Sequence, residues 1–304
     1  MAILADAESQ ILVQGITGRE AVSFVRDSLD YGAKVAAGVT PGRGGSDVHG
    51  VPVYDTVKEA VKRHKIDVAV VAVPAGFAKD AAFEAIENGV PLVVVVTERI
   101  PRRDVAQVLE LADIQRARVI GPNTMGFICP GKTKVGSVGG PARDTVKAFT
   151  PGPVGVMSRS GGMTTEVCNL LTHSGLGQST AISVGGDAVI GSTFLDLLPL
   201  FEQDPETKVV VTFSEPGGNV EAALARYLKT KGTRLPIVSF IAGSFMDNMP
   251  GVRFGHAGSI VEGKQDTVAE KARRLREAGV LVADDLSQIP DLVKKALKQK
   301  TPRK

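Results

Sequence analysis

The sequence of 304 residues has no tryptophan, only three tyrosines and two cysteines, and no long uncharged apolar run. With so few aromatic residues, no long basic stripe and a net charge of only +3, a nucleic-acid-binding surface is not expected. Cys129 and Cys168 lie far apart and match no metal-ligand spacing, so we predict no metal site and expect a reducing compartment. Neither a signal peptide nor a membrane-spanning segment is recognisable, which favours a soluble, cytoplasmic protein with no membrane partner.

The length and the 43% hydrophobic content favour two compact α/β domains. Short Val/Ile/Ala runs alternate with helix-like stretches, a pattern typical of parallel sheets covered by helices on both faces. We predict strands at residues 11–14, 34–39, 68–73, 92–97, 118–121, 154–157, 179–184, 209–213, 237–241 and 280–282, and helices at 19–31, 56–63, 78–88 and 103–113. The periodicity fades between residues 129 and 153, so we expect a connection there and domains at 1–146 and 147–304.

Two glycine-containing loops follow the first two predicted strands. Residues 13–20 (VQGITGRE) open a helix, where glycines let the backbone approach a phosphate at the positive helix end. Only Gly15 and Gly18 of the dinucleotide fingerprint are present, so a helix-start turn without a ligand is the alternative. In residues 38–45, Arg43 stands where NAD enzymes usually place an acidic residue, which suits a phosphorylated ribose unless the loop is simply a solvated turn.

Three segments of the second half could carry chemistry. Residues 158–163 (SRSGGM) lie between a predicted strand and helix and are typical of an anion-binding nest. Glu215 ends another predicted strand, and His256 lies in a loop of small residues, FGHAG. A histidine in that setting can accept a phosphoryl group if a carboxylate orients its ring, whereas a merely hydrogen-bonded loop histidine is the alternative.

The segments VQGITG, GVTPGRGG, TERIP, GPNTMG, SRSGG, GGDAVIGSTF, SEPGG and GHAG occur in this order and resemble the alpha subunit of succinyl-CoA synthetase over essentially the whole chain. The resemblance implies an α/β protein with an N-terminal Rossmann-like CoA-binding domain followed by a flavodoxin-like parallel-sheet ligase domain. It also implies an acid–thiol ligase of the tricarboxylic acid cycle. Such an enzyme uses ATP or GTP to form an acyl-CoA through a phosphohistidine and an acyl phosphate.

The same resemblance implies roles for individual residues. His256 would be phosphorylated, with Glu215 orienting it, and the phosphoryl group would be cradled by Ser160, Gly161 and Gly162. Coenzyme A would lie on Thr17, Gly18, Arg19, Glu20, Arg43, Val96, Thr97 and Glu98. ATP or GTP with Mg²⁺ is expected on a separate ATP-grasp beta subunit, so a hetero-oligomer is predicted.

Departures from the family pattern concern the acid substrate. Thr165 stands where succinate enzymes usually carry a tyrosine associated with the acid, and SRSGGM is similar to ATP citrate lyase and citryl-CoA synthetase. Succinate is the commonest substrate of the class, and citrate or malate are the alternatives. Two further hypotheses concern the function of the whole chain, which could be a noncatalytic CoA-binding module or an NADP oxidoreductase. An NADP oxidoreductase would require a full G-x-G-x-x-G motif, which is missing.

Overall fold

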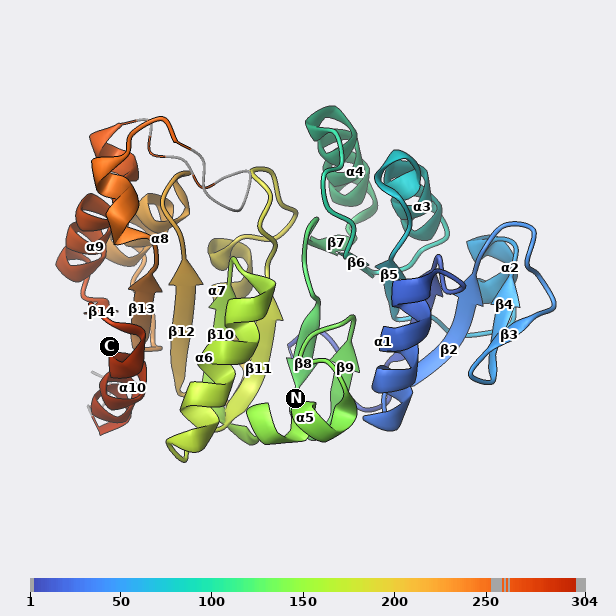
Figure 1. Cartoon of the computed structure of the whole chain (residues 1–304), viewed down its shortest axis with the longest axis horizontal. Helices are drawn as coiled ribbons and strands as arrows, with labels where there is room; N and C mark the ends of the chain where they lie inside the picture. The colour runs from blue at the N-terminus through green and yellow to red at the C-terminus, as the bar shows by residue number, and fades with distance from the viewer. Residues whose placement is uncertain (1–2, 253–258, 260, 262, 299–304) are drawn as a thin grey trace.

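The computed structural model describes residues 3–252, 259, 261 and 263–298, which form two α/β halves side by side, each built on a seven-stranded sheet (Figure 1). The two halves are joined through the segment between β7 and β8. No helix in these ranges is long and apolar enough to cross a bilayer. Both cysteines are buried and free.

The first sheet has the strand order β3-β4-β2-β1-β5-β6-β7, and only β3 runs antiparallel to its neighbour. Its strands are β1 (Gln10–Gln14), β2 (Lys34–Val39), β3 (Asp47–Val48), β4 (Val51–Tyr54), β5 (Val68–Val71), β6 (Leu92–Val95) and β7 (Arg118–Ile120). The helices are α1 (Arg19–Asp30), α2 (Val57–Val61), α3 (Ala75–Glu87) and α4 (Arg102–Gln115). The strands β5 and β6 are buried on both faces because apolar residues, mostly valine, occupy every position. The order β2-β1-β5-β6 confirms the Rossmann-like prediction.

The second sheet has the order β14-β13-β12-β10-β11-β8-β9. Its strands are β8 (Phe127–Cys129), β9 (Thr133–Val135), β10 (Pro151–Ser158), β11 (Gln178–Ser183), β12 (Val209–Ser214), β13 (Ile237–Ile241) and β14 (Leu281–Ala283). The helices are α5 (Ala142–Ala148), α6 (Gly161–His173), α7 (Phe194–Gln203), α8 (Val220–Thr230), α9 (Val268–Glu277) and α10 (Ile289–Lys298), with short 3-10 turns η1 (Ser244–Asn248), η2 (Lys264–Asp266) and η3 (Leu286–Gln288). The five parallel strands follow the order β11-β10-β12-β13-β14, which confirms the flavodoxin-like prediction.

The segment 129–153, predicted to be an interdomain connection, is more ordered than expected. It contains β9 and α5, and β8 before it pairs antiparallel with β11 of the second sheet. A boundary at residue 146 therefore falls inside α5, whereas the first sheet ends at Ile120. The sequence pattern missed these strands because each is only three residues long and β9 buries Thr133 and Lys134, which are polar.

Two predicted strands end earlier than expected, and the difference matters for function. The predicted strands extend to residues 73 and 97, but β5 ends at Val71 and β6 at Val95. The residues that follow leave the sheet at its carboxyl edge. They line the pockets described below.

Lys134 predicts a pH dependence of stability. Its side chain is fully buried, its ammonium donates to the Gly140 carbonyl, and burial lowers its pKa to about 8. Above pH 8 the unfolded chain binds more protons at this residue than the folded chain, so the free energy of unfolding rises with pH up to the unfolded pKa. Between pH 7.5 and 9.5 we expect the wild type to gain on the order of 1–2 kcal/mol relative to Lys134→Met.

Urea unfolding at the two pH values measures this difference. Lys132→Met, at a partly exposed lysine two residues earlier, is the matched control and should follow the wild type. If Lys134→Met shows the same pH dependence as the wild type, the ammonium of Lys134 is not desolvated as the structure indicates.

Candidate functional site

Two pockets open at the carboxyl edge of the first sheet, where the strand order reverses between β1 and β5. The first, of about 680 Å³, is called the apolar pocket, and its walls include Val39, Pro41, Val73 and Phe77. The second, of about 890 Å³, is called the polar cleft. Ligands of open α/β sheets bind at this edge, so the pockets mark the binding site of the first half.

The loop between β1 and α1 shapes both pockets. Gly15 has φ +81°, and a Cβ there would lie 2.5 Å from the Ala72 carbonyl oxygen, so only glycine fits. The Gly18 amide donates to the Gly15 carbonyl at 2.9 Å, and Gly18 caps α1 without any side-chain hydrogen bond. The first amides of α1 are therefore available to an anion at the positive helix end.

The residues predicted to bind CoA gather at this edge with one exception. Thr17 and Gly18 line the apolar pocket, and the polar cleft is lined by Gly18, Arg19, Glu20, Val96, Thr97 and Glu98. Arg43 lines neither pocket and is exposed on the loop after β2, whose Thr40 and Pro41 line the apolar pocket. The Thr17 hydroxyl bonds the Thr40 hydroxyl at 3.2 Å and ties the two loops together.

Several lining residues were not predicted. Phe77 on α3 lines the apolar pocket and is 66% exposed. Ser137 and Gly140 line the polar cleft from the segment between β9 of the second sheet and α5. Phe77 comes shortly after the predicted strand at residues 68–73, so the sequence could indicate its position. Nothing in the sequence predicts that Ser137 lies beside the first sheet. Apolar walls next to a free helix start fit a nucleotide with attached phosphates.

In the second half, the strand order reverses between β10 and β12, and the predicted anion nest follows β10. Ser160 is the N-cap of α6, and its hydroxyl accepts a hydrogen bond from the Met163 amide at 3.4 Å. The Ser158 hydroxyl donates to the Ser160 carbonyl at 2.7 Å, which fixes the turn. A Cβ on Gly161 would overlap the Met125 side chain, whereas one on Gly162 would meet nothing within 4 Å, so Gly162 leaves open space at the helix start.

Glu215 follows β12 beside this helix start and is half-buried. Its carboxylate accepts a hydrogen bond from the Ser259 hydroxyl at 2.5 Å. The turn is anchored by Lys271, whose ammonium donates to the carbonyls of Glu215 at 3.1 Å and Gly217 at 2.5 Å and pairs with Glu221 at 2.7 Å. Lys271 and Glu221 are almost fully buried, and neither was predicted because a lysine in a charged helix pattern is usually exposed.

His256 lies outside the described residues. Ser259, three residues further along the chain, is described and contacts Glu215. Thr165, predicted to face the acid substrate, is half-buried on α6 five residues after the N-cap Ser160. The structure therefore brings together the helix start and the carboxylate of the predicted site.

Arg159 lies in the predicted nest segment and adds a positive charge that interacts with Glu221 and Glu215, although the sequence predicts no separate role for this residue. Its guanidinium donates to the carbonyls of Asp187 at 2.9 Å and Gly186 at 3.5 Å. Burial lowers the pKa of Arg159, while the carboxylates of Glu221 and Glu215 raise it. The arginine nevertheless stays charged at neutral pH, because its ordinary pKa is far above 7.

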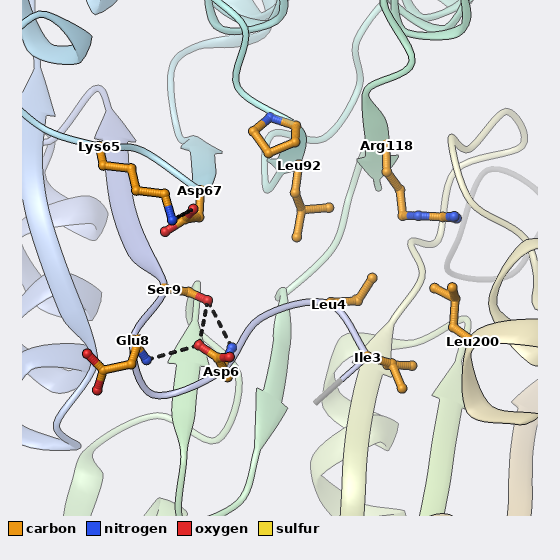
Figure 2. A pocket seen from close by; sticks show the side chains of 11 residues that line it. Ile3, Leu4, Asp6, Glu8, Ser9, Lys65, Asp67, Leu92, Arg118 and Leu200 are labelled. Atoms are coloured by element: carbon orange, nitrogen blue, oxygen red, sulfur yellow. Dashed lines mark hydrogen bonds and ion pairs between the residues drawn. The ribbon is translucent and has the colours of Figure 1, made fainter. Parts of the chain in front are cut away.

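Another pocket, of about 470 Å³, lies at the opposite end of the first sheet (Figure 2). Lys65 and Asp67 form an ion pair at 2.8 Å, and Arg118 donates to the Asp196 carbonyl at 3.4 Å. Asp6 accepts a hydrogen bond from the Ser9 hydroxyl. Because these groups satisfy one another and lie at the amino ends of the strands, we do not assign chemistry to this pocket. Among the residues that the structure describes, no cluster of His, Cys, Asp and Glu could hold a metal ion.

The chain matches two known domain families. Residues 6–99 match the CoA binding domain, and residues 157–281 match the CoA-ligase domain. The first match covers the strands that form the apolar pocket, and the second covers the anion nest and Glu215. Fold and site thus define an acid–thiol ligase chain that binds CoA.

Comparison with individual proteins shows to which family of acid–thiol ligases the chain belongs. The chain is 45% identical over 98% of its length to succinate–CoA ligase [ADP-forming] subunit alpha 1 of Archaeoglobus fulgidus, 99% of which is covered. It is 42% identical over 98% of its length to the corresponding alpha subunit of Aquifex aeolicus, 95% of which is covered. The chain belongs to the alpha-subunit family of succinate–CoA ligases.

A solved structure shares this fold. The structure of ATP citrate lyase from Methanothrix soehngenii, in complex with citrate and coenzyme A, matches 99% of this chain with a TM-score of 0.88 and 26% identity. This chain spans 53% of that longer chain. The likeness to ATP citrate lyase seen in the sequence is therefore confirmed for the fold.

Proposed function

We propose that this chain is the CoA-binding and phosphohistidine-carrying alpha subunit of a cytoplasmic ligase that forms succinyl-CoA from succinate, CoA and ATP or GTP. One observation of the structure carries the proposal. The helix start at Ser160 and the carboxylate of Glu215 follow β10 and β12, which are neighbours at the point where the strand order reverses. A positive helix end beside a carboxylate suits a histidine that is phosphorylated and discharged in turn.

In this proposal His256 accepts the phosphoryl group from ATP or GTP bound with Mg²⁺ on a separate ATP-grasp beta subunit, so the working enzyme is a hetero-oligomer. Glu215 orients the imidazole, and the amides after Ser160 hold the phosphoryl oxygens. The group then passes to the acid to give an acyl phosphate. CoA supplies the thiol that displaces phosphate, and the first sheet holds CoA through the pocket residues and Arg43.

The experiment is phosphorylation of the copurified complex with labelled ATP or GTP, followed by challenge with CoA plus succinate, malate or citrate. We expect an acid-labile label on His256 that CoA plus succinate discharges. If no label forms with the partner present, the ligase proposal fails, and a noncatalytic CoA-binding role is the better account.

Citrate is the second candidate acid, because Thr165 leaves more room on α6 than the tyrosine usual in succinate enzymes. The half-buried position of Thr165 beyond the helix start supports a role in choosing the acid. Discharge by citrate and not by succinate would identify the chain as part of a citrate-activating ligase.

Arg43→Ala tests the proposed CoA site. Loss of a charge-assisted contact with a phosphate is expected to raise the Kd for CoA about tenfold, while phosphorylation by ATP stays unchanged because Arg43 lies on the other half of the chain. Isothermal titration calorimetry measures the Kd, and Arg103→Ala, at an exposed position on α4, is the control. An unchanged affinity in Arg43→Ala would remove this loop from the CoA site.

A further inference from the structure

The segment at residues 121–124 connects the two proposed sites through its backbone. The Asn123 amide donates to the Thr97 carbonyl at 3.0 Å, on the edge that lines the polar cleft. The same segment is also bonded to the loop after β11 of the second sheet. The Gly186 amide donates to the Asn123 carbonyl at 3.1 Å, and the Gly121 amide donates to the Val184 carbonyl at 3.2 Å. Asn123 is therefore bonded to both halves of the protein.

The side chain of Asn123 extends this connection. Its amide nitrogen donates to the Asp187 carboxylate at 2.9 Å, and the Asp187 carbonyl accepts from the Arg159 guanidinium at 2.9 Å. Asn123 has φ +57°, a left-handed conformation that glycine, asparagine and aspartate tolerate better than other residues. A continuous path of hydrogen bonds thus runs from Thr97 to Arg159.

Arg159 is where this path meets the anion nest. It directly precedes Ser160, the N-cap of α6, and its own amide donates to the Phe213 carbonyl at 3.0 Å, two residues before Glu215. Any shift of the 184–187 loop would change the support of the Arg159 side chain, and with it the residue that begins the nest. The three side chains are partly buried, which protects their hydrogen bonds from water.

We propose that Asn123, Asp187 and Arg159 are positioning residues that hold the anion-binding start of α6 in register with the CoA-binding edge of the first sheet. This inference rests on the function proposed above. None of the three needs to touch the reacting atoms. Their contribution is to the step in which CoA meets the acyl phosphate, because a misplacement of about 1 Å between reacting groups can cost up to about 10²-fold in rate.

Four variants of the copurified complex test the network. Asn123→Asp places two carboxylates together, and Asn123→Gly removes the side chain while keeping the left-handed backbone. Asp187→Asn keeps an acceptor for Asn123 and is the matched control. The double variant Asn123→Asp/Asp187→Asn restores the hydrogen bond with donor and acceptor exchanged.

We expect labelling by ATP to be lowered much less than discharge in the Asn123 variants, because the turn at Ser160 keeps its own hydrogen bonds to Ser158 and Met163 and only its placement against the first sheet is loosened. Discharge, measured as the acyl-CoA that the labelled complex forms with CoA plus acid, should fall about tenfold or more in Asn123→Asp and Asn123→Gly and recover in the double variant. Wild-type discharge in both single Asn123 variants, or no recovery in the double variant, overturns the proposal. Equal losses in labelling and discharge would show a general structural role and would overturn it as well.

A second measurement does not depend on turnover. CoA added to the 304-residue chain should slow hydrogen exchange in the peptide covering residues 158–165. Asn123→Asp should lose this protection, and the double variant should regain it. If the wild-type complex takes no label, the proposed function fails, and the exchange experiment still decides whether the two edges are coupled. No CoA-dependent protection in the wild type overturns the coupling.

Discussion

Replacement of His256 by asparagine is expected to abolish phosphate incorporation from ATP or GTP and to leave CoA binding unchanged. Asparagine has no nitrogen that can act as a nucleophile at neutral pH, whereas a neutral imidazole has one. The proposed CoA site lies on the first sheet, and the CoA binding domain match ends at residue 99, far from residue 256 in the sequence. The measurement is labelling of the copurified complex, with the Kd for CoA determined on the same preparation.

The matched control is His173→Asn. His173 is exposed at the end of α6, where its Nδ1 forms a hydrogen bond with the Asn169 carbonyl at 2.8 Å. This variant should take up label as the wild type does. Persistent acid-labile label in His256→Asn would mean that another residue carries the phosphoryl group, and the assignment of His256 would be wrong.

The fold could be predicted where the sequence repeats a strong local signal. Residues 68–71 and 92–95 are continuous apolar runs, and each lies in a fully buried parallel strand. The hairpin of β8 and β9 could not be predicted in the same way, because strands of three residues show no clear period and β9 buries Lys134. Its place is decided by pairing with β11, about fifty residues later in the chain.

The candidate site also has residues that the sequence predicts and residues that it does not. Loops that follow strands, such as those at Gly18 and Ser160, were recognisable because a short segment carries both the glycines and the helix start. Arg159 and Lys271 were not, since their partners lie 28 and 50–56 residues away in the sequence. Residues that hold a site in place through distant contacts leave no local pattern.

Lys271 is the clearest example of a residue that holds the site through contacts distant in sequence. We expect Lys271→Met to lower the free energy of unfolding by about 3–5 kcal/mol. The variant leaves the Glu221 carboxylate buried without its cation, and it removes the donor for the carbonyls of Glu215 and Gly217. Urea unfolding measures the loss. The exposed pair Lys229 and Glu277 is the control: Lys229→Met should cost no more than about 1 kcal/mol.

The double variant Lys271→Met/Glu221→Leu separates stability from positioning. Replacing both charges by apolar groups of similar size removes the unpaired carboxylate, so much of the lost stability should return. The carbonyls of Glu215 and Gly217 still lack the Lys271 ammonium, so the turn that carries the proposed catalytic carboxylate loses this anchor, and the rate of phosphorylation should stay about tenfold or more below that of the wild type. Recovery of both stability and labelling in the double variant would show that Lys271 only neutralises Glu221. Recovery of stability alone assigns Lys271 the task of holding Glu215 in place.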